Sequence, residues 1–164
     1  AINEYAYVLF GLQDYMENIK KSHRQGYAHI AKSLDLLPPS WRSYGENNYF
    51  FIDDLENLIQ MIGGNGFFMF EIYFGAGIYH QNKQKLQFCR ELYQNLVLPL
   101  QEYLLYAYVW RGNTSSPNTL WFGNNHCAED RKCLKNITMS EIEQQCRSCI
   151  DDNENGSCSL VLEF

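Results

Sequence analysis

The spacing of apolar residues predicts an amphipathic helix at the beginning of the chain. Apolar side chains recur every three or four residues from Ile2 through Leu9 and Met16 to Ile19. This spacing places them on one face of a helix that runs to about Lys21 or, as the alternative, on past Gly26. We therefore expect the segment to pack against other elements of the chain, or against a partner, through a single apolar face.

A second helix is predicted to begin near Asp53. Asp53 and Glu56 have the spacing of a capping box, in which two side chains satisfy the free N–H groups of a helix start. Gly63 and Gly64 then provide a strong stop. Before this helix, Pro38 and Pro39 mark a break in the regular pattern.

The run Phe67–Phe74 is compatible with two structures. Its aromatic and β-branched residues favour a buried strand, but periodicity alone does not exclude a buried helix. Glu71 is the one charged residue in the run. We expect an outward-facing Glu71 at the edge of a pocket, with a partnered buried carboxylate as the alternative.

The most regular pattern predicts a long helix over about residues 82–111. Its apolar stripe is Leu86, Cys89, Tyr93, Leu96, Leu100, Tyr103, Ala107 and Trp110. Pro99 is expected to bend or interrupt the helix. Because Cys89 lies on the stripe, it is predicted to face inward.

The last third of the chain is predicted to be a cysteine-rich extension. A polar loop over 112–117 separates it from the preceding body. Ser140 and Glu143 form a capping-box pattern for a short helix that ends near Ile150. Residues 159–164 are compatible with a strand.

Together these elements predict a mainly α fold. We expect a bundle of three or four helices with a disulfide-stapled C-terminal extension, with or without one short β element. The chain would be one domain, with an aromatic-rich helical body over 1–112 and the extension over 113–164 packed on it.

Composition narrows the class of protein. The chain is 46% hydrophobic and 15% aromatic, which excludes a disordered chain. A net charge of −6 speaks against nucleic acid as a partner, because nucleic-acid binding needs a basic surface. No stretch is long and apolar enough to predict a membrane span.

Cysteines and glycosylation sequons both concentrate in the last third of the chain. An even number of cysteines predicts disulfides, although fifteen connectivities remain open; the six are Cys89, Cys127, Cys133, Cys146, Cys149 and Cys158. Asn-x-Ser/Thr sequons lie at Asn113, Asn136 and Asn155. Since disulfides and glycans belong to the same route, the pattern predicts a secreted glycoprotein, with a periplasmic or intracellular location as alternatives.

Two metal sites are alternatives to this interpretation. Cys127, Cys133, Cys146 and Cys149, with His126 as a substitute, offer the four ligands that a structural Zn²⁺ needs. Asp151, Asn153 and Asn155 match the first half of a calcium loop, but Leu162 occupies the position of the required glutamate. An ordinary acidic turn explains the second pattern equally well.

The sequence carries no recognised catalytic motif, and none of the four histidines belongs to a known triad pattern. We expect a secreted or extracellular binding or structural module that acts through protein–protein contacts or self-assembly. One alternative is a carrier of an apolar small ligand, with Phe67–Tyr79 as a pocket wall. The other is an intracellular, zinc-stabilised helical protein.

Overall fold

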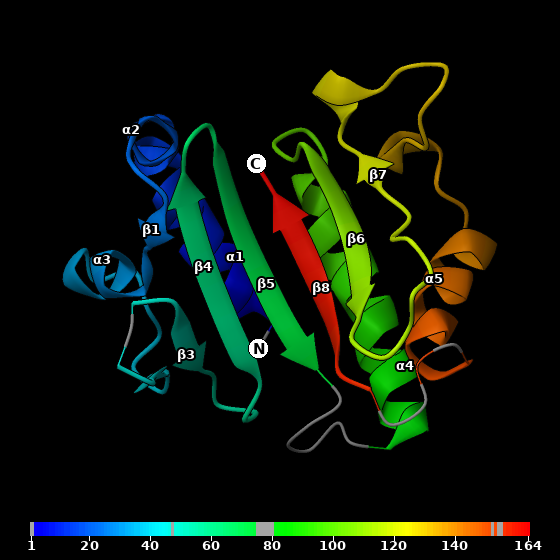
Figure 1. Cartoon of the computed structure of the whole chain (residues 1–164), viewed down its shortest axis with the longest axis horizontal. Helices are drawn as coiled ribbons and strands as arrows, with labels where there is room; N and C mark the ends of the chain where they lie inside the picture. Colours follow the sequence, from blue (N-terminus) through cyan, green and yellow to red (C-terminus); the bar gives the residue numbers. More distant parts are fainter. Residues whose placement is uncertain (1, 47, 75–80, 152, 154–155) are drawn as a thin grey trace.

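The computed structural model describes residues 2–46, 48–74, 81–151, 153 and 156–164. Within this part of the chain, the main element is an eight-stranded antiparallel sheet. Its order is β2 (Arg42–Tyr44), β3 (Phe50–Ile52), β4 (Leu58–Gly64), β5 (Phe67–Phe74), β8 (Cys158–Glu163), β6 (Tyr106–Arg111) and β7 (Trp121–Phe122), with β1 (Gln25–Gly26) paired to β4. The last strand in sequence, β8, therefore lies between β5 and β6 (Figure 1).

The longer helices lie on one side of this sheet and at its edges. The helices are α1 (Ile2–Leu12), α2 (Met16–Lys21), α3 (Ala28–Ser33), α4 (Asn82–Leu92) and α5 (Met139–Asp151). Figure 1 shows α1 and α4 behind the sheet, α2 and α3 beside β1 and β4, and α5 beyond β6. Short 3₁₀ turns cover 13–15, 98–100, 124–126 and 134–136, and a π-helical turn covers 93–97. The first predicted helical segment is confirmed as far as Lys21, where α2 ends. The alternative extension past Gly26 is wrong, because Gln25 and Gly26 form β1.

The prediction of a mainly α bundle is wrong. The run Phe67–Phe74 is a strand, and Tyr106–Arg111, predicted to continue the long helix, is a strand as well. The helix of residue 82 onward reaches only Leu100, directly after Pro99, whose ring nitrogen has no N–H to donate to the helical ladder. The residues after it also alternate between the two sides of a strand, and this period of two prevails because β8 offers a long-range partner.

The helix predicted to begin at Asp53 is also wrong, because this region forms hairpins. The Asp53 side chain accepts hydrogen bonds from the backbone N–H groups of Leu55 and Asn57, at 2.9 and 2.8 Å, which shapes the turn between β3 and β4. After β4, Asn65 and Gly66 both have positive φ, of 55° and 93°. An Asn-Gly pair with this conformation is a strong hairpin signal, so the glycines join two strands instead of ending a helix.

The core lies between the sheet and the helices behind it. Alternate side chains of β5 and β8 point to this side, and they are almost fully buried: Phe68, Phe70, Ile72, Phe74, Leu160 and Leu162. Helix α1 contributes Tyr5, Val8, Leu9 and Leu12 to the same cluster. Burial of large aromatic groups accounts for much of the stability of such a core.

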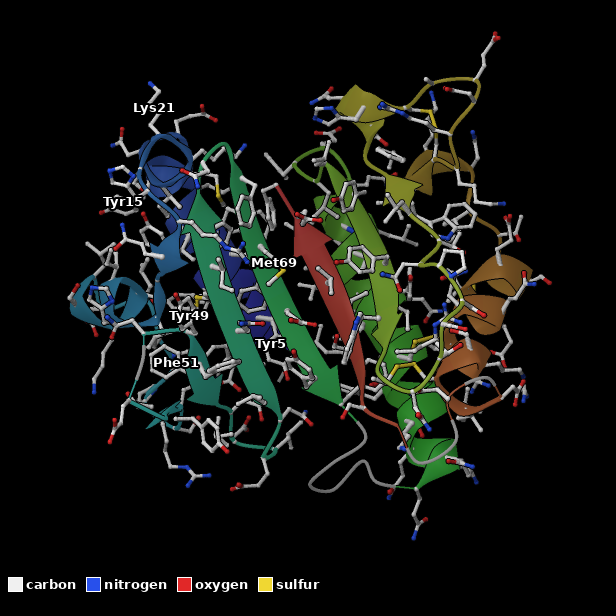
Figure 2. The ribbon with its side chains drawn as sticks, in the orientation of Figure 1. Tyr5, Tyr15, Lys21, Tyr49, Phe51 and Met69 are labelled. Atoms are coloured by element: carbon white, nitrogen blue, oxygen red, sulfur yellow. A yellow bond between two sulfur atoms is a disulfide. The ribbon has the colours of Figure 1, made fainter. Side chains whose placement is uncertain are left out.

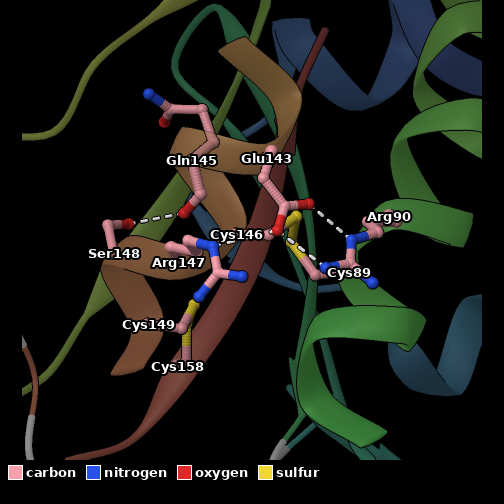
Figure 3. The surroundings of a disulfide bond; sticks show 9 residues. All are labelled: Cys89, Arg90, Glu143, Gln145, Cys146, Arg147, Ser148, Cys149 and Cys158. Atoms are coloured by element: carbon pink, nitrogen blue, oxygen red, sulfur yellow. Dashed lines mark hydrogen bonds and ion pairs between the residues drawn. A yellow bond between two sulfur atoms is a disulfide. The ribbon is translucent and has the colours of Figure 1, made fainter. Parts of the chain in front are cut away.

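Three disulfides are present, and they use all six cysteines. Cys89–Cys146 joins α4 to α5, and Cys149–Cys158 joins α5 to β8 (Figure 3). Cys127–Cys133 closes a short loop between β7 and α5. The prediction that the cysteines are cross-linked is confirmed, and so is the prediction that Cys89 faces inward. Because Cys89 faces inward, it can form the disulfide that joins α4 to α5.

Helix α5 is capped two residues earlier than its sequence pattern predicts. The Thr138 backbone N–H donates to Glu141 at 3.0 Å, and the Glu141 N–H donates to the Thr138 hydroxyl at 3.1 Å. This reciprocal pair is a capping box. Its displacement leaves Glu143 free to bind Arg90 of α4, at 2.5 and 2.7 Å, as well as Arg147 at 3.0 Å (Figure 3).

No helix among the described residues has the length and apolar character needed to cross a membrane.

Candidate functional site: the open face of the sheet

One face of the sheet is not covered by the described helices, and it faces the viewer in Figures 1 and 2. Because side chains alternate along a strand, the register of the strands assigns every second residue to this side. We call the side chains of β4, β5, β8 and β6 on this side the open face. Its aromatic and acidic members are Phe67, Glu71, Tyr73, Tyr106, Tyr108, Trp110 and Glu163.

The aromatic side chains of the open face form a band across the strands. The rings of Tyr73 and Trp110 meet edge to face, with centroids 6.0 Å apart. Tyr106 contacts Tyr108 at 5.8 Å and Phe122 of β7 at 5.4 Å. These side chains are half-buried, so each ring keeps part of its surface in contact with solvent. A band of this kind offers apolar area with a polar hydroxyl at the edge, which is typical of protein interfaces.

Glu71 shares the open face with this band and is only 6% exposed. The Ser159 hydroxyl donates a hydrogen bond of 2.5 Å to its carboxylate, and Tyr73 forms a second hydrogen bond with it. Burial raises the pKa of Glu71 above its ordinary value, and the two hydrogen bonds act against this rise. The expected position at the edge of a pocket is therefore wrong: Glu71 is the partnered, buried carboxylate of the alternative.

A second carboxylate lies diagonally across the same face. Glu163 of β8 lies opposite Met69 of β5 and Tyr106 of β6. Glu71 faces Val161, which is two positions before Glu163 on β8. Burial, followed by the charges of Glu163 and Glu71, raises the pKa of Tyr108 to about 12. Burial and a hydrogen bond with Glu163 also raise the pKa of Tyr106. Tyr108 thus lies within the electrostatic influence of both carboxylates.

Basic residues of the chain lie at the edges of this surface. The Arg24 guanidinium is 5.7 Å from the ring centroid of Phe67, and that of Arg131 is 4.4 Å from the centroid of Phe122. Both distances are in the range of a cation–π contact. The open face therefore has an acidic, aromatic centre between two arginine-covered phenylalanine rings.

A separate cavity of about 700 Å³ lies between α5, β6 and the segment leading into β7. Arg111, Lys132, Glu143 and Arg147 line it, so its walls carry both signs of charge. These groups already have partners within the chain: Arg147 binds Glu143, Lys132 lies over the ring of Trp121, and Arg111 donates to the backbone carbonyls of residues 116 and 117. Because each of these charges already has a partner within the chain, the cavity shows no preference for one class of ligand.

The predicted glycosylation residues lie in different parts of the surface. Asn113, in the loop after β6, and Asn136, at the end of a 3₁₀ turn, are both exposed. Exposure makes both accessible to modification, and their use as glycosylation sites stays a prediction. Asn155 lies outside the described residues.

The predicted metal ligands have the following positions. The Asn153 side chain is buried, its oxygen accepts a 2.6 Å hydrogen bond from the Asn113 backbone N–H, and its amide donates to the Ser157 carbonyl at 2.9 Å. Asp151 ends α5 with an exposed side chain, and Asn155 is not described. No cluster of three or more metal-binding side chains occurs among the described residues. The thiolates required for the zinc alternative are all in disulfides.

Most residues of the open face were not recognised from the sequence as a group. Tyr103, Ala107 and Trp110 fit a helical stripe, which hid the alternation of outward Tyr106, Tyr108 and Trp110 with inward residues. This period-two pattern over Tyr106–Arg111 was the available signal. Glu163 and Ser159 had no such signal, since their position beside Glu71 depends on pairing between distant strands.

Comparison of the chain with protein-family models, with curated protein sequences and with solved structures finds no match. Its function must therefore be argued from the geometry of its own residues.

Proposed function

We propose that the protein is a secreted, extracellular binding module whose open face contacts a protein partner. The observation that carries the proposal is the band of half-buried aromatic side chains on a sheet face that the described helices leave uncovered. Tyr and Trp are the residues most often found at the energetic centres of protein interfaces. The three disulfides support the extracellular part of the proposal, because such bonds persist in oxidising compartments.

Site-specific photo-crosslinking tests this function. A benzophenone amino acid would replace Tyr108 on the open face or, as a control, Tyr7, which is 59% exposed on α1. The labelled protein would be irradiated in the extracellular fluid in which the native protein occurs. We expect discrete adducts when the benzophenone is at position 108. None of these adducts should form when it is at position 7.

Competition decides whether these adducts are specific. Excess unlabelled native protein should suppress them, whereas a folded Trp110→Ala variant should not, because it lacks part of the aromatic band. An adduct with a second copy of the chain would identify self-assembly. The absence of adducts at position 108, or equal labelling from both positions, would contradict the proposal.

A carrier of an apolar ligand is a second candidate, supported by one observation. Tyr73 and Phe74, from the run predicted to be a pocket wall, line a cavity of about 480 Å³. Its other walls include apolar Ile52 and Leu58 and charged Glu56 and Lys85. Residues 75–79 of that wall lie outside the described residues. Native mass spectrometry of the purified protein would detect a retained ligand, and the absence of both a retained ligand and binding of lipid-like probes would exclude this function.

A further inference from the structure

We infer that the open face recognises an arginine side chain of its protein partner, held over the rings of Tyr73, Tyr108 and Trp110 with the carboxylates of Glu71 and Glu163 close by. This inference rests on the proposed function and adds the chemistry of the contact. It is argued from the charge of the face, from the arginines that the chain already places at its edges, and from the chemistry of the guanidinium group.

The charge of the face is one-sided at its centre. On β4, β5, β8 and β6, the described side chains of the open face include two carboxylates, Glu71 and Glu163, and no lysine, arginine or histidine. Glu71 has neutral hydrogen-bond partners, Ser159 and Tyr73, and forms no ion pair within the described part of the chain. A buried carboxylate is stabilised most by an opposite charge, so the face is complementary to a cation.

The chain itself places cations over aromatic rings, and elsewhere in the fold one of them is Lys132 over Trp121. At the two edges of this surface, Arg24 lies over Phe67 and Arg131 lies over Phe122. At the centre, no basic side chain of the described residues lies over Tyr73, Tyr108 or Trp110. At both edges the protein forms a cation–π contact with its own arginine. An arginine of a partner would form the same kind of contact at the centre.

The guanidinium group fits this place better than an ammonium group. It is planar, stacks on aromatic faces and is more weakly hydrated, so it loses less free energy when it leaves water. Trp and Tyr are the rings that attract cations most strongly. The hydroxyl of Tyr73 donates toward the Glu71 carboxylate, which increases the electron density of that ring. The Tyr73 ring and the Glu71 carboxylate therefore both attract the cation.

The test compares the binding of arginine, blocked at both its amino and carboxyl groups, with the binding of citrulline, its neutral isostere. N-acetyl-arginine amide and N-acetyl-citrulline amide would be titrated into the native, disulfide-bonded protein at physiological salt, with aromatic ¹H–¹³C NMR as the readout. We expect arginine to shift the signals of Tyr73, Tyr108 and Trp110, with an affinity about tenfold higher than that of citrulline. N-acetyl-lysine amide should bind more weakly than arginine.

Charge-removing variants identify the residues responsible. Glu71→Gln and Glu163→Gln should each weaken arginine binding by severalfold, up to about tenfold. Glu17→Gln on α2, whose side chain is 80% exposed, should leave it unchanged. If Glu71→Gln does not fold, Glu163→Gln at the half-buried position carries the test.

Several results would overturn the inference. These are equal binding of arginine and citrulline, tighter binding of lysine, shifts that map outside the open face, or an unchanged affinity in both carboxylate variants. If arginine does not bind while photo-crosslinking at position 108 succeeds, the inference fails and the proposed function stands. If crosslinking fails as well, both are wrong.

Discussion

At the scale of single residues, two carboxylates are buried in different surroundings. Asp53 is 1% exposed and accepts hydrogen bonds from the Tyr5 hydroxyl and from two backbone N–H groups, while Glu71 binds Ser159 and Tyr73. Burial raises the pKa of each above its ordinary value, despite these hydrogen bonds. A carboxyl group with a raised pKa holds its proton more strongly in the folded state, so its contribution to stability is lost as the pH rises through that pKa.

The first prediction concerns this pH dependence at Glu71. In the native protein, the free energy of unfolding should fall between the ordinary Glu pKa of 4.5 and neutral pH, partly because Glu71 ionises in a buried place. Glu71→Gln should reduce this fall, since glutamine does not ionise. Urea unfolding at both pH values, followed by circular dichroism, measures the difference. Glu17→Gln serves as the control, and an identical fall in native protein and Glu71→Gln would contradict the prediction.

The second prediction concerns Tyr108. Its pKa of about 12 means that the folded state keeps the phenol protonated at pH values where the unfolded chain, with an ordinary pKa of 10, begins to lose the proton. The free energy of unfolding should therefore fall as the pH rises above 10, and Tyr108→Phe should fall less. NMR of the Tyr108 ring carbon measures the pKa directly. The exposed substitution Tyr7→Phe should leave the titration of Tyr108 unchanged, and titration of Tyr108 near 10 would refute the assignment.

At the scale of elements, α5 is held to the rest of the protein by covalent and polar contacts of different kinds. Cys146 and Cys149 bind it to α4 and β8, and the half-buried ion pair of Arg90 with Glu143 adds a second contact to α4. The partners of this ion pair are about one-third exposed, so solvent screens it and its contribution is small. The disulfides therefore dominate the attachment of this helix.

The third prediction compares two disulfides that close loops of different length. Cys89–Cys146 spans 57 residues and Cys127–Cys133 spans 6. Because a long loop restricts the unfolded chain more, replacing the first pair by alanines should destabilise the protein by about 4 kcal/mol, and replacing the second by about 2 kcal/mol. Urea unfolding of both double variants measures the order, and a larger loss from the short loop would contradict the entropic explanation.

The fourth prediction distinguishes two possible N-terminal caps of α5. The structure shows a cap formed by Thr138 and Glu141, whereas the sequence pattern indicates Ser140 and Glu143. Thr138→Ala removes the hydroxyl that accepts from the Glu141 N–H and should destabilise the protein by about 1 kcal/mol. Ser140→Ala should have little effect, although Ser140 and Glu143 have the same spacing. Thermal unfolding of the two variants is the measurement, and the reverse order would place the helix start at Ser140.

At the scale of the whole molecule, the fold depends on contacts between distant parts of the chain. The contact of Glu71 with Ser159 joins residues 88 positions apart, and β8 completes the sheet between β5 and β6. Folds with many such contacts form slowly, because distant segments must meet before any pairing stabilises them. The disulfide between α5 and β8 maintains this arrangement once it has formed.

The fifth prediction concerns the oxidation state of the whole protein. Intact mass of the native material should rise by about six mass units on reduction, two for each of the three disulfides. Glycosidase treatment should lower the mass if Asn113, Asn136 or Asn155 carries a glycan. An unchanged mass on reduction would be incompatible with the disulfides, and an unchanged mass on glycosidase treatment would contradict the prediction that the sequons are used.

Features that depend on neighbouring residues were predictable from the amino-acid pattern. The apolar spacing from Ile2 to Ile19 predicted the first helix, and the position of Cys89 on an apolar stripe predicted an inward thiol, because both depend on neighbours a few residues away. The Asn65-Gly66 turn carried an equally local signal, which a helix interpretation of the preceding residues outweighed.

The remaining features depend on contacts between distant parts of the chain. Residues 103–110 satisfy a helical spacing, yet Tyr106–Arg111 form a strand because β8, far away in the sequence, supplies their pairing partners. Pairing of β8 with both β5 and β6 brings Glu71, Tyr108 and Glu163 onto one face. The folded chain likewise forms one of the fifteen possible disulfide connectivities. Local spacing specifies which face of an element is apolar, whereas the partner of that face is set by the free energy of packing the whole chain.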